Sequence, residues 1–151
     1  MKTSKELYIV DDSEDHRFII QNIFSKFLPS YPVRLFRGAK ELYELLILQA
    51  DVNYQGGLPG LIILDMKMPV IKGSDLLRLL RQTPDNDKMS WKTFPIVMMS
   101  SQSSPQEIAE CYQAGASSFF TKPTDYEELK ILFRVLCKFW LDYNRLPSKI
   151  S

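Results

Sequence analysis

Residues 61–65 read LIILD, a short apolar run that ends in a carboxylate. Residues 66–73, MKMPVIKG, contain a proline and a glycine and are typical of a loop. An uncharged run of this length with β-branched residues predicts a buried strand. Asp65 is therefore expected at the end of a strand, where a reactive side chain is exposed and yet rigidly held.

Other short apolar runs have the same character and alternate with longer amphipathic segments. This alternation predicts a parallel sheet with helices on both faces, which is a three-layer α/β/α sandwich. The strands are expected at 6–10, 33–37, 61–65, 95–100 and 117–121. The helices are expected at 14–28, 38–50, 73–82, 105–115 and 125–143. At 151 residues the chain predicts one domain over 1–151, with a core of about 6–124 and a long last helix at about 125–143.

Polar and charged residues follow four of the five expected strands. In sheets of this kind, ligands bind at the carboxyl ends of the strands. The residues expected at these ends are Asp11, Asp12, Asp65, Ser100 and Lys122. Three carboxylates and one lysine at a common edge predict a site for a cation and a phosphoryl group.

The bulk composition excludes several other classes of protein. The formal net charge of +1 gives no support for binding to DNA or to a membrane surface, and the N-terminus has no apolar signal core. Cys111 and Cys137 lie far apart and are interpreted as reduced thiols, which together with the missing signal predicts a cytoplasmic protein. His16, the single histidine, is interpreted as a solvated or helix-capping residue.

Four motifs in the same order resemble the receiver domain of bacterial two-component response regulators. They are Asp11-Asp12 after the first strand, Leu64-Asp65-Met66-Lys67-Met68-Pro69 with Gly73, Ser100 after the fourth strand, and Lys122-Pro123 after the fifth. The likeness covers nearly the whole chain. It implies a flavodoxin-like, doubly wound sheet of five parallel strands in the order 2-1-3-4-5.

The resemblance implies that Asp65 accepts a phosphoryl group from a phosphohistidine and forms an aspartyl phosphate. Asp11, Asp12, Asp65 and the backbone carbonyl of Lys67 would bind Mg²⁺, which prefers oxygen ligands. Lys122 would neutralise charge during the transfer. The chain would act as a signalling protein that assists its own phosphorylation and dephosphorylation, and not as a separate enzyme.

The resemblance also implies a switch. Ser100 would bind a phosphoryl oxygen and pull its loop inward, while the aromatic side chain at Phe119 would change rotamer. Because Phe119 has no hydroxyl where the family often has tyrosine, such a switch would depend on packing alone. The family also implies a cis peptide bond before Pro123, which would direct Lys122 inward.

The last expected helix has more apolar residues than one docking stripe requires. Ile131, Val135 and Phe139 form a second ridge, for which two interpretations stay open: a helix covered by its own domain, or an interface with a second copy or with a kinase. Residues 139–147 are similar to the C-terminus of phytochrome-associated single-domain regulators. The sequence continues into no DNA-binding domain, so the expected partners are a sensor histidine kinase or phosphotransfer protein and a downstream protein target.

Three alternative functions remain for comparison. A flavodoxin-type electron carrier needs a Ser/Thr/Gly-rich phosphate loop after the first strand, where this chain has two aspartates. A phosphatase with an aspartate nucleophile needs an Asp-x-Asp pattern after that strand, which is absent. A pseudo-receiver would bind partners without phosphoryl chemistry, against which the complete acidic set argues.

Overall fold

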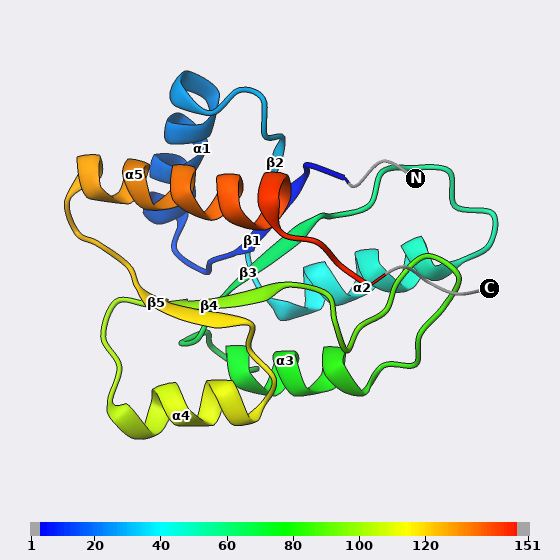
Figure 1. Ribbon diagram of the computed structural model, residues 1–151. Helices are drawn as coiled ribbons and strands as arrows, with labels where there is room; N and C mark the ends of the chain where they lie inside the picture. The colour runs from blue at the N-terminus through cyan, green and yellow to red at the C-terminus, as the bar shows by residue number, and fades with distance from the viewer. Residues whose placement is uncertain (1–3, 148–151) are drawn as a thin grey trace.

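The computed structural model describes residues 4–147, and its centre is one parallel five-stranded sheet (Figure 1). The strand order β2-β1-β3-β4-β5 confirms the predicted three-layer, doubly wound fold. The strands are β1 (Leu7–Val10), β2 (Val33–Phe36), β3 (Leu61–Asp65), β4 (Ile96–Ser100) and β5 (Ser118–Thr121). Residues 1–3 and 148–151, which belong to the domain predicted over 1–151, lie outside the described residues.

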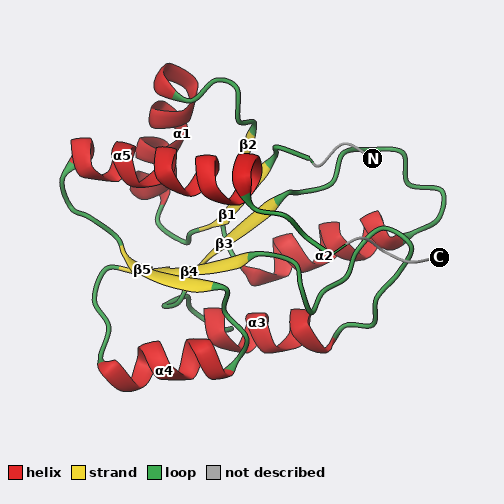
Figure 2. Cartoon of the chain, in the orientation of Figure 1, coloured by secondary structure: helices red, strands yellow, loops and turns green. Residues whose placement is uncertain are grey.

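Five α-helices cover the two faces of the sheet, with α1 and α5 on one face and α2, α3 and α4 on the other (Figures 1 and 2). They are α1 (Glu14–Phe27), α2 (Ala39–Ala50), α3 (Gly73–Gln82), α4 (Pro105–Gln113) and α5 (Tyr126–Cys137). No helix within residues 4–147 is long and apolar enough to cross a membrane.

Alternate residues of the strands point to opposite faces and create two separate cores. Tyr8, Ile62 and Leu64 pack under α2, α3 and α4, whereas Leu7, Ile9 and Ile63 pack under α1 and α5. All of these residues are fully buried. Burial on both faces explains why the strands are continuous apolar runs and not alternating ones.

Local signals in the sequence place the ends of α4. The Ser104 side chain accepts a hydrogen bond from the backbone N–H of Glu107, and the Glu107 side chain accepts one from the N–H of Ser104. Pro105 occupies the first turn, where a missing N–H costs nothing. Gly115 follows the helix with φ +107°, a left-handed conformation that glycine adopts without a Cβ penalty.

The last helix differs from the regular α-helix predicted over 125–143. After Cys137 it continues as a π-helix, η1 (Lys138–Tyr143), so each turn takes in about one extra residue. Leu141 is thereby buried against the α1/α5 core, whereas Tyr143 is 69% exposed. Asp142 accepts a hydrogen bond from Tyr31 and lies 3.0 Å from the ammonium of Lys5. These contacts fasten the end of the helix to the segments before β1 and before β2.

Two longer loops, 51–60 and 83–94, are held at the amino ends of the strands by cationic side chains. Arg81 donates to the carbonyls of Phe94 and Gly115 at 2.7 and 2.8 Å. Lys88 Nζ donates to the carbonyls of Gln49 and Asp51 at 3.0 and 2.7 Å. Both loops therefore lie away from the carboxyl edge of the sheet.

Gly73 is the position where the fold leaves no space for a side chain. A Cβ there would overlap the carbonyl oxygen of Asp65 and lie 2.9 Å from Cα of Met66. The Gly73 N–H also donates to the Met66 carbonyl at 3.0 Å, which fixes the start of α3 against the end of β3. Neither backbone contact can move without displacing the end of the strand.

We expect Gly73→Ala to lower the free energy of unfolding by about 2 kcal/mol, the range of overpacking in a closely packed site. Gly38→Ala is the matched control, because a Cβ at Gly38 would meet no atom within 4 Å. Urea unfolding of both variants measures the difference. A loss at Gly73 no larger than the loss at Gly38 would contradict the close approach.

Candidate functional site

The carboxyl ends of β1, β3 and β5 bring three carboxylates and one ammonium group together. Asp11 directly follows β1, Asp65 is the last residue of β3, and Lys122 directly follows β5. The parallel register sets these ends side by side, with Val10 opposite Leu64 and Ser100 opposite Thr121. One oxygen from each of Asp11, Asp12 and Asp65 lies within 4.8 Å of the others.

Asp11 is the buried member of the cluster, with no exposed surface. Its Oδ1 accepts a hydrogen bond from the Ser13 N–H at 2.9 Å, and its Oδ2 accepts one from Lys122 Nζ at 2.7 Å. Arg17 donates to the backbone carbonyl of Asp11 at 2.8 Å. Asp12 is exposed. One aspartate of the pair is therefore fixed by the protein, and its neighbour faces the solvent.

Asp65 combines partial burial with a carboxylate neighbourhood. Its Oδ1 accepts a hydrogen bond from the Lys67 N–H at 3.0 Å. The pKa of Asp65 is raised from 3.8 to about 6. Burial is the main cause and the nearby charges of Asp11 and Asp12 add to it, while the Lys67 hydrogen bond and the charge of Lys122 act in the opposite direction. The carboxyl group thus carries a proton more readily than an ordinary aspartate does.

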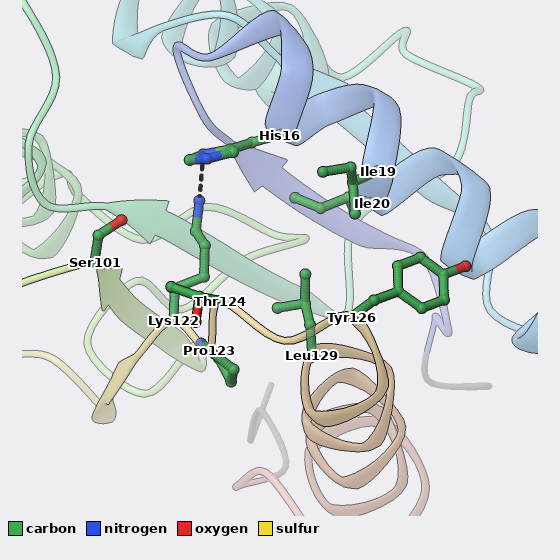
Figure 3. A pocket seen from close by; sticks show the side chains of 9 residues that line it. All are labelled: His16, Ile19, Ile20, Ser101, Lys122, Pro123, Thr124, Tyr126 and Leu129. Atoms are coloured by element: carbon green, nitrogen blue, oxygen red, sulfur yellow. Dashed lines mark hydrogen bonds between the residues drawn. The ribbon is translucent and has the colours of Figure 1, made fainter.

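Lys122 is buried, and its ammonium lies between α1 and the end of β1. Besides Asp11, it contacts Nδ1 of His16 at 2.9 Å (Figure 3). The expectation of a cis peptide bond before Pro123 is wrong: the bond is trans, and no cis peptide occurs within residues 4–147. Trans is the lower-energy form even before proline. The pairing with Asp11 directs the lysine inward without a cis bond.

Ser100 and Phe119, the residues expected to act as the switch, lie on neighbouring strands: Ser100 ends β4, and Phe119 lies within β5 opposite Met98. Ser100 is buried, and its hydroxyl donates to the Gln102 carbonyl at 2.7 Å. Phe119 is partly buried against the core under α2, α3 and α4. The backbone N–H of Phe119 donates to the hydroxyl of Tyr112 at 3.2 Å. The serine hydroxyl is therefore turned toward its own loop.

The loop after β3 has a backbone conformation that the sequence did not indicate. Val70 has φ +71°, the one positive φ at a non-glycine residue within 4–147. The Ile71 N–H donates to the Pro69 carbonyl at 2.8 Å, which closes a three-residue γ-turn around Val70. A β-branched residue rarely adopts this conformation, so the loop that carries Lys67 is locally strained.

His16 is the site residue that the sequence analysis missed. It was interpreted as solvated or capping, yet its ring contacts Lys122 and lies 3.5 Å from Asp11 Oδ2. The available signal was its place in the first turn of α1, because that turn begins at the edge where the strands end. The sequence spacing between His16 and Asp11 does not by itself indicate that His16 contacts Lys122, which follows β5.

Fold and site together define a parallel α/β protein with an acidic edge suited to a cation and a phosphoryl group. The chain belongs to the family of response regulator receiver domains, whose model matches residues 7–134. It is therefore a signalling domain of two-component systems. This membership leaves no support for the flavodoxin-type alternative.

Relatives of this family occur in plants and bacteria. The two-component response regulator ORR3 of Oryza sativa is 31% identical over 130 residues, which cover 85% of this chain and 88% of ORR3. The response regulator Rcp1 of Synechocystis is 23% identical over 145 residues, which cover 95% of this chain and 94% of Rcp1. Other relatives are longer: the matched region spans 15% of the sensory/regulatory protein RpfC of Xanthomonas campestris.

Solved structures share the fold over almost the full chain. The phosphorylated cyanobacterial phytochrome response regulator RcpA has a TM-score of 0.79 at 23% identity, and the match covers 96% of this chain and 99% of RcpA. The Mn²⁺-bound form of Rcp1 has a TM-score of 0.71 at 22% identity, and the match covers 95% of this chain and 99% of Rcp1. At these identities the likeness establishes the fold.

The donor set of the acidic cluster fits a hard divalent cation. Mg²⁺ takes oxygen ligands at about 2.0–2.1 Å, so opposite ligands lie about 4.2 Å apart. The three carboxylate oxygens lie within 4.8 Å of one another and would draw closer together around one ion, because ligands that are not opposite lie about 2.9 Å apart. A bound cation would offset the repulsion that raises the pKa of Asp65.

The raised pKa of Asp65 predicts a dependence of stability on pH. The folded protein holds this proton up to a pKa of about 6, against 3.8 for the ordinary group. Ionisation therefore lowers the free energy of unfolding as the pH rises through this interval, and the loss is complete above it. In metal-free buffer we expect Asp65→Asn to be more stable than the wild type by about 1–2 kcal/mol at neutral pH, with allowance for solvent screening.

This difference in stability should shrink as the pH falls toward 4, because the wild-type carboxyl group then becomes neutral as well. Urea unfolding of both proteins at several pH values measures it. Asp87→Asn is the control for loss of one exposed charge in a loop. A difference between Asp65→Asn and the wild type that stays constant with pH would contradict the raised pKa.

Proposed function

We propose that this chain is a phosphorylation-switched response regulator that accepts a phosphoryl group on Asp65 with the help of Mg²⁺. The donor would be the phosphohistidine of a sensor histidine kinase or of a phosphotransfer protein. The observation that carries the proposal is the half-buried Asp65 within an acidic cluster that also contains the buried ammonium of Lys122. Family membership supplies the signalling context.

The hydrogen bonds of Asp65 indicate which oxygen would react. Oδ1 accepts from the Lys67 N–H, which leaves Oδ2 as the nucleophile. Oδ2 would form a bond to phosphorus as the phosphorus–nitrogen bond of the phosphohistidine breaks, and the released imidazole nitrogen would take up a proton. The ionised carboxylate is the reactive form, so the cluster favours attack once its negative charges are neutralised.

Two kinds of positive charge would provide this neutralisation. Asp11, Asp12, Asp65 and the carbonyl of Lys67 would bind Mg²⁺, which supplies charge stabilisation for the transferred group. Lys122 would donate a hydrogen bond to a phosphoryl oxygen that the Mg²⁺ ion does not bind. Its ammonium already lies 2.7 Å from Asp11 Oδ2 and lowers the pKa of Asp65 through its charge.

Phosphorylation would change the structure through Ser100. To bind a phosphoryl oxygen, its hydroxyl must leave the Gln102 carbonyl, which it now contacts at 2.7 Å. The loop after β4 would move with it, and Phe119 on the adjacent strand would repack without a hydroxyl to fix its position. The phosphoryl group would thereby shift the population between two arrangements of the β4–α4 and β5 region.

The output would pass through contacts with another protein. One specific surface favours self-association: Ile131, Val135 and Phe139 are 54%, 56% and 49% exposed, on the outer side of the last helix. Three apolar side chains in one ridge form the kind of patch that marks an interface. We therefore include a homodimer through the last helix in the proposal, next to a separate downstream target.

Phosphorylation can be tested with a small-molecule donor. Wild type incubated with acetyl phosphate and Mg²⁺ should gain the mass of one phosphoryl group, whereas Asp65→Asn should gain none, because an amide cannot form the acyl phosphate. Intact-protein mass spectrometry measures both. Asp87→Asn is the matched control and should be labelled like the wild type.

Metal dependence supplies a second arm of the same experiment. Asp12→Ala should slow labelling and remove its dependence on Mg²⁺ concentration, since the exposed carboxylate of the cluster is then missing. If the wild type takes up no label, or if Asp65→Asn is labelled equally, Asp65 is not the phosphoacceptor. Absence of label on the wild type would favour the pseudo-receiver interpretation, whereas equal labelling of Asp65→Asn would place the phosphoryl group on another residue.

Self-association is tested separately. Phe139→Glu places a charge in the exposed ridge and should shift a dimer to monomer in size-exclusion chromatography with light scattering. Ile47→Glu on α2 is the matched control, because Ile47 is 61% exposed but lies outside the last helix. An unchanged mass for Phe139→Glu means that this ridge is not a dimer contact.

A further inference from the structure

His16 contacts the ammonium group of Lys122, although the two residues are far apart in the sequence. Nδ1 of its ring lies 2.9 Å from Lys122 Nζ, and Figure 3 shows the imidazole facing the end of the lysine side chain. The backbone of His16 is itself fixed, because its N–H donates to the Ser13 side chain that caps α1. The ring therefore approaches Lys122 from a rigid first turn.

The chemistry of the pair determines the direction of this hydrogen bond. An ammonium group has three donors and no acceptor, so the imidazole nitrogen that faces it must accept. Nδ1 is then unprotonated, and the ring proton resides on Nε2. The His16 side chain is 42% exposed, which allows water to reach the ring.

Two of the three N–H groups of Lys122 thus have acceptors in the protein. One bonds to Asp11 Oδ2 at 2.7 Å and another to His16 Nδ1 at 2.9 Å. Two fixed acceptors restrict the position of the ammonium nitrogen and leave one N–H for a further acceptor. With one acceptor alone, the nitrogen could swing about that acceptor at the end of its flexible stem.

A cavity beside the lysine explains why a second acceptor matters. A pocket of about 270 Å³ lies next to Lys122, and Ile19, Pro123 and Tyr126 are among its lining residues (Figure 3). Lysine has a flexible four-carbon stem with about 2 kcal/mol of rotamer entropy. The open space gives this stem alternative positions, and the contact with His16 restricts them.

We propose that His16 is a positioning residue that holds the ammonium of Lys122 ready for the phosphoryl group on Asp65. This role rests on the proposed function, because the acceptor for the third N–H of Lys122 would be an oxygen of the phosphoryl group on Asp65. His16 touches neither Asp65 nor a transferred group in this arrangement. It acts through Lys122 and supplies a neutral acceptor that does not cancel the positive charge.

Two substitutions separate the acceptor from the bulk of the side chain. Asparagine places Oδ1 at the same number of bonds from Cα as Nδ1 of histidine, whereas leucine places a methyl group there. We expect His16→Leu to lower the labelling rate at saturating acetyl phosphate about three- to tenfold, the effect of losing one hydrogen bond of ordinary net strength. His16→Asn should restore the rate to within about twofold of wild type.

The kinetic pattern distinguishes positioning from a general loss of structure. The half-saturating acetyl phosphate concentration should change less than the saturating rate, because the lysine acts mainly on charge that develops during transfer. Equal unfolding midpoints for the leucine and asparagine variants would exclude destabilisation as the cause. Equal rates for leucine and wild type, or equal losses for leucine and asparagine, would overturn the acceptor role.

The single histidine of the chain also permits a spectroscopic test that needs no phosphoryl donor. With any affinity tag removed, the nitrogen-15 spectrum of the side chain contains one imidazole, and we expect unprotonated Nδ1 with the proton on Nε2. A neutral ring that carries its proton on Nδ1 would overturn the contact. Wild type that takes no label would overturn the proposed function and this role with it, whereas label uptake matched by His16→Leu overturns the positioning role alone.

Discussion

The ion pair between Lys122 and Asp11 is the interaction on which the rest of the site depends. Both side chains are buried, and their charged atoms are 2.7 Å apart. A buried charge is costly without a partner, so each group requires the other to remain ionised in the folded protein. The pair also joins the end of β1 to the end of β5, which lie on opposite sides of β3 and β4. It therefore spans the edge at which Asp65 stands.

The same pair determines the electrostatic balance around Asp65. When Asp65 is ionised, three carboxylates face one ammonium, and the excess of negative charge suits a divalent cation. The charge of Lys122 lowers the pKa of Asp65, but burial and the charges of Asp11 and Asp12 outweigh this effect. Because the metal-free site has an excess of negative charge, a bound cation would stabilise it. The arrangement thus couples metal binding to the reactivity of the nucleophile.

The sequence predicted the sheet well because its signals are local. Each strand is a continuous apolar run, and parallel strands with helical crossovers leave few topologies. Asp11, Asp12 and Asp65 meet because residues after parallel strands share one edge. The contact of His16 with Lys122 was missed, since it depends on how the first turn of α1 faces a residue after β5. The prediction of a cis bond before Pro123 was wrong. It came from the likeness to the family and had no support in a local feature of this chain.

The π-helix at the end of the chain was also beyond prediction, since its cause is tertiary. Only the fold shows that Asp142 meets Tyr31 and Lys5 while Leu141 enters the core. A π-turn holds about one residue more than an α-turn, so it behaves like a one-residue insertion absorbed within the helix. An alignment of this segment with a regular α-helix therefore needs a gap within 138–143. Without that gap, Leu141 and Asp142 would be matched to positions on the wrong side of the helix.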